Sequence, residues 1–341
     1  MKLSILDQSP IIAGHGAAQA LEETLRLARR ADELGYHRYW LAEHHAIAAL
    51  ADPCPEILLA RLGAETTRIR VGTGGVLLPY YSAFKVAEVF RMLEALYPGR
   101  IDLGIGRAPG GDRRTARAVG GGHREGVGGP FSPSADAEQF PQQVWELVGY
   151  LDGTLPAGHP FKNVRVQPEG KTAPELWLLG SSDYSGLLAA QLGVRFSFAH
   201  FINAQGGDLV MRAYKDRYQT SGREPEPHTS VCCFVICAVS DAEAERLAKV
   251  VDCRRLDMAY NLDTVVPTQE QAETRSFNAE ERAHIRSQRA RLVHGSADTC
   301  KEKLLAIAEQ FSADELMVLT ITGDYATRLQ SYEMLARAFE L

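Results

Sequence analysis

The run GYHRYWLAEHH, residues 35–45, places a glutamate and two adjacent histidines directly after a strand-like apolar stretch. Because extended residues alternate sides, His44 and His45 do not face the same point. One of them is a candidate general base or hydrogen-bond donor toward a bound reactant. The pair also fits satisfied polar core residues. A metal-dependent hydrolase is a further hypothesis, and it would need His200 as an additional ligand.

A second strand-like run, IRVGTGGVLL (69–78), carries glycines inside it. Glycine weakens a strand, so its presence there marks a bulge or the close approach of another group. A flat ring lying against bare backbone beside Thr73, Gly74 and Gly75 fits this pattern. A tight bend of the sheet also fits it.

Two further strand-like runs end in groups that suit an anion. IDLGIGRAPGG (101–111) carries an arginine just past its strand, and a guanidinium binds a phosphate through paired hydrogen bonds. ELWLLGSSDYSG (175–186) opens a helix with serines, and helix N-terminal amides plus hydroxyls suit a phosphate. Plain N-capping explains the serines as well. The two runs together predict a phosphate clamp that consists of Arg107, Gly180, Ser181, Ser182 and Ser185.

These candidates share one position, because each follows a short apolar strand that precedes a helix. Eight such units, with strands buried on both faces, predict an α/β fold of the (β/α)8 TIM-barrel type. A doubly wound sheet is the alternative. Catalytic groups of such barrels lie at the carboxyl ends of the strands. The expected strands of this single domain, residues 1–341, are 3–7, 37–43, 69–78, 101–106, 175–180, 195–201, 230–239 and 315–321.

Long insertions follow the fourth and seventh predicted strands. Residues 107–135 are rich in glycine and arginine, and residues 254–295 are polar and charged. Insertions after barrel strands lie on the catalytic face and often act as lids. A surface loop without a role is the alternative for 107–135.

Composition excludes some classes of partner. The net charge is −6 with 45% hydrophobic residues, which gives no basic surface for nucleic acid or acidic membranes. No signal peptide and no membrane-spanning run is visible, so we expect a cytoplasmic protein. The six cysteines form no CxxC pair, and we interpret them as buried thiols.

The segments LAEHHA, VGTGGVLLPYYSAFKVAEVFRMLEALYPGRIDLGIGRAPGGD and PELWLLGSSDYSGLLAAQLG, taken together, resemble the bacterial-luciferase-like flavin monooxygenases. The resemblance covers nearly the whole chain. It implies a barrel that takes reduced FMN from a separate flavin reductase and uses oxygen to oxidise a small organic substrate. It also implies a homodimer. The implied roles are catalysis for His44, a non-proline cis bond under the flavin ring at Gly74–Gly75, and phosphate binding for Arg107 and Gly180 to Ser185.

The sequence departs from luciferase proper at two positions beside the flavin. Ser181 stands where luciferase has an acidic residue, and Gly106 stands where it has a cysteine. Light emission and a long-chain aldehyde substrate are therefore not implied. The chain is more similar to the single-subunit branch of the family, whose members carry the same GSSDYS-type run. A deazaflavin-dependent oxidoreductase and a non-catalytic flavin-binding protein or partner subunit are the alternatives.

Overall fold

The computed structural model describes residues 1–107, 111–120 and 133–341. Eight parallel strands close into a barrel in the order β1 to β7 followed by β9, which pairs with both β7 and β1. The predicted (β/α)8 TIM barrel is therefore confirmed. The strands are β1 (Lys2–Asp7), β2 (Arg38–Leu41), β3 (Arg70–Leu77), β4 (Ile101–Gly106), β5 (Glu175–Gly180), β6 (Arg195–Ala199), β7 (Thr229–Ala238), β8 (Leu292–Ser296) and β9 (Glu315–Leu319).

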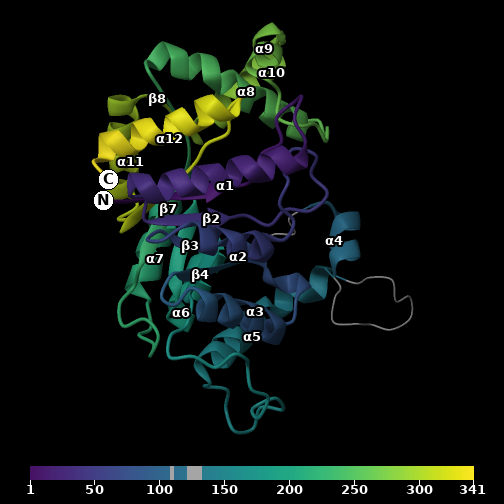
Figure 1. Ribbon diagram of the computed structural model, residues 1–341, viewed down its shortest axis with the longest axis vertical. Coiled ribbons are helices and arrows are strands. Elements are labelled where there is room, and N and C mark those ends of the chain that lie inside the picture. The colour runs from purple at the N-terminus through teal and green to yellow at the C-terminus, as the bar shows by residue number, and fades with distance from the viewer. Residues whose placement is uncertain (108–110, 121–132) are drawn as a thin grey trace.

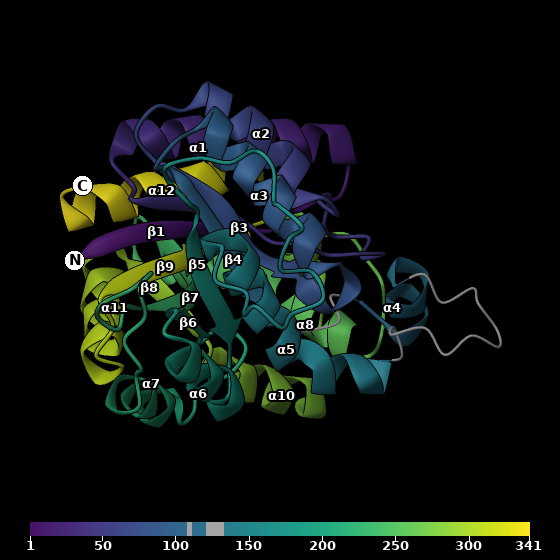
Figure 2. The same ribbon diagram turned by 90° about the horizontal axis from the view of Figure 1, so that it is seen from below.

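Helices surround this barrel (Figure 1). Seen from below, α1, α2 and α3 cover one side of the strands, while α6 and α7 cover the opposite side (Figure 2). The helices of the described residues are α1 (Ala17–Leu34), α2 (Pro55–Glu65), α3 (Ala83–Leu96), α4 (Arg113–Val119), α5 (Pro133–Asp152), α6 (Asp183–Leu192), α7 (Gly207–Asp216), α8 (Asp241–Ala259), α9 (Gln269–Thr274), α10 (Ala279–Arg289), α11 (Ala297–Gln310) and α12 (Tyr325–Phe339).

Strand β8 was missed in the sequence, because it lies within the segment 254–295 that was interpreted as an insertion. Residues Ser230 to Phe234 of β7 pair with β9, whereas Phe234 to Ala238 pair with β8. Strand β7 therefore extends beyond the barrel at its carboxyl end, and β8 widens the sheet there. The run LVHGS is short and contains a histidine and a glycine, so no continuous apolar run marks it as a strand.

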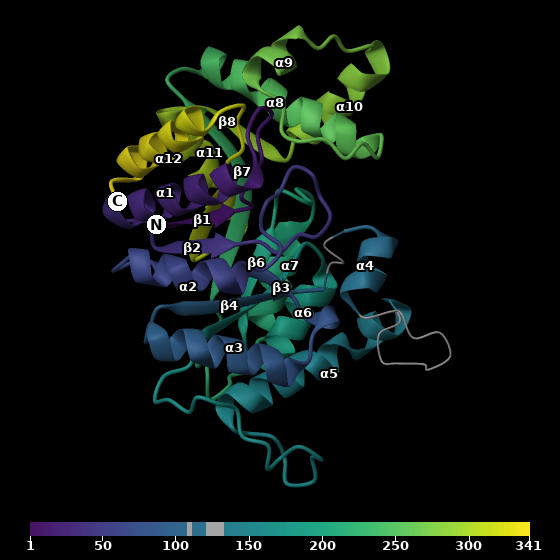
Figure 3. The same cartoon turned by 45° about the vertical axis from the view of Figure 1, so that its right-hand side comes forward.

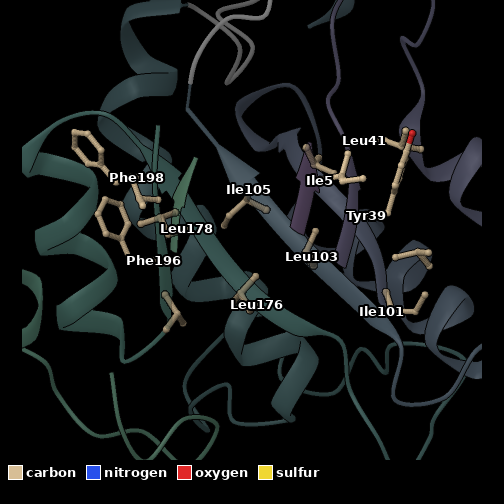
Figure 4. Close-up of a cluster of buried hydrophobic side chains, with 14 of the residues drawn as sticks. Ile5, Tyr39, Leu41, Ile101, Leu103, Ile105, Leu176, Leu178, Phe196 and Phe198 are labelled. Carbon is tan, nitrogen blue, oxygen red and sulfur yellow. The ribbon is translucent and has the colours of Figure 1, made fainter. Parts of the chain in front are cut away.

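Successive side chains along each strand point alternately into one of two apolar layers, because the side chains of a β-strand repeat every two residues. One set of side chains points outward and packs under the helices, as Figure 4 shows for residues such as Ile5, Tyr39, Leu103, Leu178 and Phe196. The other set fills the inside of the barrel. This inner layer includes Leu6, Trp40, Trp177, Cys232 and Met317.

The segment after β7 packs against the loops that follow β1 and β2. The amide of Val266 donates to the Ile11 carbonyl at 2.9 Å. Asp263 Oδ1 accepts from the Ala48 amide at 2.8 Å, in the loop that carries His44 and His45. Figure 3 shows α4 and the α9–α10 segment on the same side of the barrel. The insertion therefore helps to hold the loop after β2 in place.

The segment 107–135, in which a lid was expected, is described only in part. Helix α4 lies within it, and its N-cap Asp112 accepts from the Thr115 amide at 2.7 Å. Residues 108–110 and 121–132 are outside the described part of the chain. Among the described residues, no helix is long and apolar enough to cross a membrane.

Candidate active site

A cavity of about 390 Å³ opens at the carboxyl ends of the barrel strands, a size that suits a cofactor or a small ligand. It brings together all the predicted site residues except Thr73. Thr73 is fully buried in the barrel wall, where its hydroxyl donates to the Gly104 carbonyl at 2.9 Å. The predicted residues that line the cavity are His44, Gly74, Gly75, Arg107, Gly180, Ser181, Ser182 and Ser185.

The two adjacent histidines after β2 have different surroundings. His44 lines the cavity, whereas His45 turns away, and its Nε2 lies 2.7 Å from Glu43 Oε1. The Glu43 carboxylate also accepts from the Leu77 amide at 2.8 Å and from the Tyr81 hydroxyl at 2.6 Å. Glu43 therefore ties the loop after β2 to the end of β3, and this tie fixes the backbone that presents His44.

The His44 ring is a neutral group in the wall of the cavity. Its Nδ1 is buried and has no hydrogen-bond partner among the described residues. Burial lowers the pKa of His44 to about 4, and this effect outweighs the Ala42 backbone, which favours the charged ring. A neutral imidazole with an unpaired nitrogen can accept or donate one proton at neutral pH.

The glycine pair in β3 is required by the protein's own packing. A Cβ at Gly74 would lie 2.7 Å from Leu6 Cδ1, and one at Gly75 would lie 2.7 Å from the Gly104 carbonyl oxygen. The β3–β4 register shifts between Gly74 and Val76, so the expected bulge and the expected close approach are both present. The peptide bond between Gly74 and Gly75 is cis. The pair also faces the cavity, so its backbone is open to a flat ligand.

The two predicted anion-binding segments meet at one side of the cavity. Arg107 is exposed, and its guanidinium stacks on the Tyr184 ring with Cζ 4.3 Å from the ring centroid. Ser182 is the N-cap of α6, but its side chain makes no capping hydrogen bond. Plain N-capping, the alternative explanation, therefore does not account for this hydroxyl. An arginine, serine hydroxyls and a helix N-terminus converge where a phosphate would be stabilised.

The apolar wall of the cavity was not predicted from the sequence. Cys232 was interpreted only as a buried thiol, yet it lines the cavity, and burial raises its pKa well above the usual value. The parity of β7 is a signal that could have revealed this, because alternate residues of a barrel strand point inward. Gln8, which follows β1, adds a neutral amide. The other apolar members of the wall include Leu6, Trp40, Leu179, Phe201, Ile202 and Met317.

His200 does not join His44 in the cavity lining. Its ring lies against Phe311, with the centroids 5.7 Å apart. The described residues contain no group of three or more histidine, cysteine, aspartate or glutamate side chains that could hold a metal ion. The geometry that the metal-hydrolase hypothesis requires is therefore not formed by these residues.

The fold and the site together define a TIM-barrel enzyme that has a mostly apolar cavity, a neutral histidine and an anion clamp at the carboxyl ends of its strands. The chain belongs to the luciferase-like monooxygenase family, whose model matches residues 1–315. It is therefore an oxidoreductase, and the predicted resemblance is confirmed.

Three relatives cover almost the full length of the chain. The Bacillus subtilis protein YwcH is 43% identical and covers 99% of both chains. The Escherichia coli K12 luciferase-like monooxygenase is 37% identical and covers 97% of this chain and 95% of its own. The N-acetyl-S-alkylcysteine monooxygenase of Bacillus subtilis is 34% identical and covers 99% and 98%.

Solved structures share the fold. The apo form of MsnO8 has a TM-score of 0.85 at 37% identity and covers 100% of this chain and 98% of its own. The oxygenating constituent of 3,6-diketocamphane monooxygenase from Pseudomonas putida, in complex with FMN, has a TM-score of 0.71 at 19% identity, covering 99% and 97%. An F420-dependent secondary alcohol dehydrogenase has a TM-score of 0.68 at 13% identity, covering 99% and 98%. The last two likenesses establish the fold alone.

Proposed function

We propose that the protein is an FMN-dependent monooxygenase of the two-component type. In this proposal, a separate flavin reductase supplies reduced FMN, and oxygen oxidises a small organic substrate. The observation that carries the proposal is the convergence of Arg107, stacked on Tyr184, with the serines of the β5–α6 turn in the same cavity as His44. A phosphate-bearing ring compound fits this arrangement, because the clamp lies at one side and bare backbone lies beside it.

The residues of the cavity fit FMN in chemical type. Arg107, Ser181, Ser182 and Ser185 would hold the phosphate, and the backbone at Gly74–Gly75 would lie against the ring. Reduced FMN, when bound, supplies two electrons for the reaction of oxygen with the substrate.

The chain itself positions the reactants, excludes water and handles a proton. Leu6, Trp40 and Met317 line the inner part of the cavity with apolar surface, which keeps bulk water from the reacting atoms. The low pKa of His44 keeps its ring neutral at physiological pH, so the unpaired Nδ1 can form a hydrogen bond with a bound reactant and take part in proton transfer without storing the added proton.

The experiment is an anaerobic titration of the protein with reduced FMN and, in parallel, with reduced riboflavin, which lacks the phosphate. We expect the dissociation constant of reduced FMN to be at least about 10-fold lower than that of reduced riboflavin. After mixing with oxygen, we expect bound FMN to be reoxidised at a rate that differs from that of free FMN, with consumption of oxygen.

Other outcomes of this titration would contradict the proposal. Binding of reduced deazaflavin in place of FMN would make the protein a deazaflavin-dependent oxidoreductase. Binding of FMN with the oxygen reaction of free flavin would make it a flavin carrier or a partner subunit.

We propose a homodimer that forms through α2 and α3. Ile57 on α2 and Met92 and Leu96 on α3 are exposed by 70%, 55% and 53%. Large apolar side chains that gather on two adjacent helices favour a protein interface. The molar mass in solution, from light scattering, tests this.

We also propose a cytoplasmic location, which the six free cysteines favour.

A further inference from the structure

We propose that two arginines at the rim of the cavity, Arg255 and Arg291, bind an anionic group of the organic substrate, which is then a carboxylate with an apolar body. This inference rests on the proposed function, because it concerns the substrate of the same cavity. It assigns a second anion-binding position in addition to the clamp around Arg107.

Arg291 lies at the rim, between α10 and β8. Its Nη1 donates to the Ile202 carbonyl at 2.6 Å. Ile202 lines the cavity, and half of its surface is exposed. The guanidinium of Arg291 is therefore held beside the mouth of the cavity by a residue of the cavity wall.

Arg255, on α8, lies next to Arg291. Its Nη2 donates to the Arg291 carbonyl at 3.3 Å, and its Nη1 donates to the Gln288 carbonyl at 2.6 Å. Its Cζ lies 5.7 Å from the ring centroid of Phe234, which packs against the apolar layer inside the barrel. The insertion after β7 thus places a second guanidinium against the backbone of Arg291 and near Phe234.

These two arginines make no direct ion pair among the described residues, although the Asp252 carboxylate acts on Arg255 from a greater distance. Neither forms an ion pair with a described carboxylate, whereas Arg275 and Arg289 in the same insertion pair with Asp257 and Asp252. Burial, assisted by the nearby Arg291, lowers the pKa of Arg255 to about 10. An arginine has five donor hydrogens, and the carbonyl contacts use only some of them. An incoming anion would satisfy the remaining donors and relieve the repulsion between the two cations.

The apolar part of the wall selects the body of the substrate. Phe201, Ile202, Cys232 and Met317 present apolar or neutral groups, and Gln8 presents a neutral amide. Because the Cys232 thiol stays protonated, it adds no charge. A molecule with an apolar body and one carboxylate would bury the body in the cavity and leave the carboxylate at the rim, where the arginines lie.

The test measures binding of straight-chain carboxylates, from butanoate to decanoate, against the matching uncharged amides. Calorimetry would be run on the protein with and without oxidised FMN. We expect at least one carboxylate to bind about 10-fold more tightly than its amide. R291Q and R255Q should each reduce this preference to about 3-fold or less. R286Q is the matched control, because Arg286 is exposed on α10 and its loss changes the net charge equally.

A wild-type protein without any carboxylate preference would overturn the inference, and so would a preference that survives in both R255Q and R291Q. Since Arg291 also holds the Ile202 carbonyl, R255Q decides the matter if R291Q does not fold. The ratio of FMN to riboflavin affinity should be unchanged in these variants. A collapsed ratio would show that the arginines bind the cofactor phosphate instead.

The same measurements separate the inference from the proposed function. A carboxylate preference that depends on the two arginines, in a protein that does not bind FMN, would support the anion site and contradict the monooxygenase assignment. FMN binding without the preference would support the assignment and contradict the anion site.

Discussion

The two ends of the barrel differ in whether their charged and polar groups have partners. At the amino ends of the strands, Arg38 and Asp102 are buried, and they form an ion pair at 2.8 Å. Arg38 also binds Glu315 through Nε at 2.8 Å and Nη2 at 3.0 Å. Asp102 accepts further hydrogen bonds from Trp40 Nε1 at 2.9 Å and from Arg70 Nε at 2.8 Å. The guanidiniums and carboxylates of this network are thus matched to one another.

At the carboxyl ends, Glu43 is paired, but several polar groups around the cavity have no polar partner among the described residues. His44 Nδ1 has no partner within the described chain, the Ser182 side chain does not cap its helix, and Arg107 is exposed and stacks on the Tyr184 ring. Arg255 and Arg291 lack carboxylate partners among the described residues, as argued above.

The polar groups at the two ends therefore have different uses. A matched buried network fixes the strands, but it has no donor left for a ligand. An unmatched set costs stability in the free protein, and a ligand can recover that cost on binding. We therefore expect changes at the amino ends to act on the free energy of unfolding, and changes at the carboxyl ends to act on binding and reactivity.

The largest expected effect is that of Asp102→Ala. Removal of this carboxylate leaves the buried Trp40 indole without its acceptor and takes one carboxylate partner from each of the Arg38 and Arg70 guanidiniums, and should lower the free energy of unfolding by about 3–5 kcal/mol. Urea denaturation followed by circular dichroism measures this. Glu65→Gln, which removes a carboxylate paired with exposed Arg29 and Arg61, is the control and should leave the unfolding midpoint nearly unchanged. Equal effects of the two changes would remove the contrast between a buried network and the surface.

His44→Asn should act on reactivity rather than on stability. Without the neutral imidazole, we expect the reaction of bound reduced FMN with oxygen to change in rate by about 100-fold, while the dissociation constant of FMN stays nearly the same. Stopped-flow absorbance after oxygen mixing measures the rate. His45→Asn is the control at the neighbouring position. Because His45 contacts Glu43, we expect this change to lower the stability of the protein. A His44 variant with the wild-type rate would exclude a catalytic role.

Arg107→Ala should weaken FMN binding by about 1.5–3 kcal/mol, or roughly 10- to 150-fold, if the guanidinium binds the phosphate. Riboflavin affinity should change little, because riboflavin has no phosphate. Arg114→Ala, on the exposed face of α4, is the charge-matched control. An unchanged FMN dissociation constant in Arg107→Ala would take this residue out of the clamp.

The last prediction concerns the dependence of stability on pH. Burial lowers the pKa of His44 from 6.5 to about 4, so the folded protein binds this proton less readily than the unfolded chain does. The resulting stabilisation is fully present above pH 6.5 and is lost as the pH falls toward 4. In the His44→Asn variant, the acid-induced loss of stability between these values should be smaller than in the wild type. An NMR titration of the His44 ring with a midpoint near 6.5 would contradict this.

Much of the fold followed from local patterns. The eight barrel strands were visible because parallel strands buried on both faces are continuous apolar runs. The ends of those strands then indicated His44, Arg107 and the serines of 181–185, since a barrel gathers its strand ends at one rim. Strand β8 was not predicted, because it lies outside the barrel and pairs only with the part of β7 that extends beyond it.

The barrel, the candidate residues at its rim and, by resemblance, the family could be predicted from the order of the amino acids. Only the folded chain shows which of two adjacent histidines faces the cavity, that Thr73 lies in the wall, and that Arg255 contacts the backbone of Arg291, whose side chain contacts Ile202. The physical reason is the range of the interactions. Hydrophobic periodicity is a property of residues that are neighbours in the chain. The pairing of a charge depends on segments that are far apart in the chain and meet only when the barrel closes.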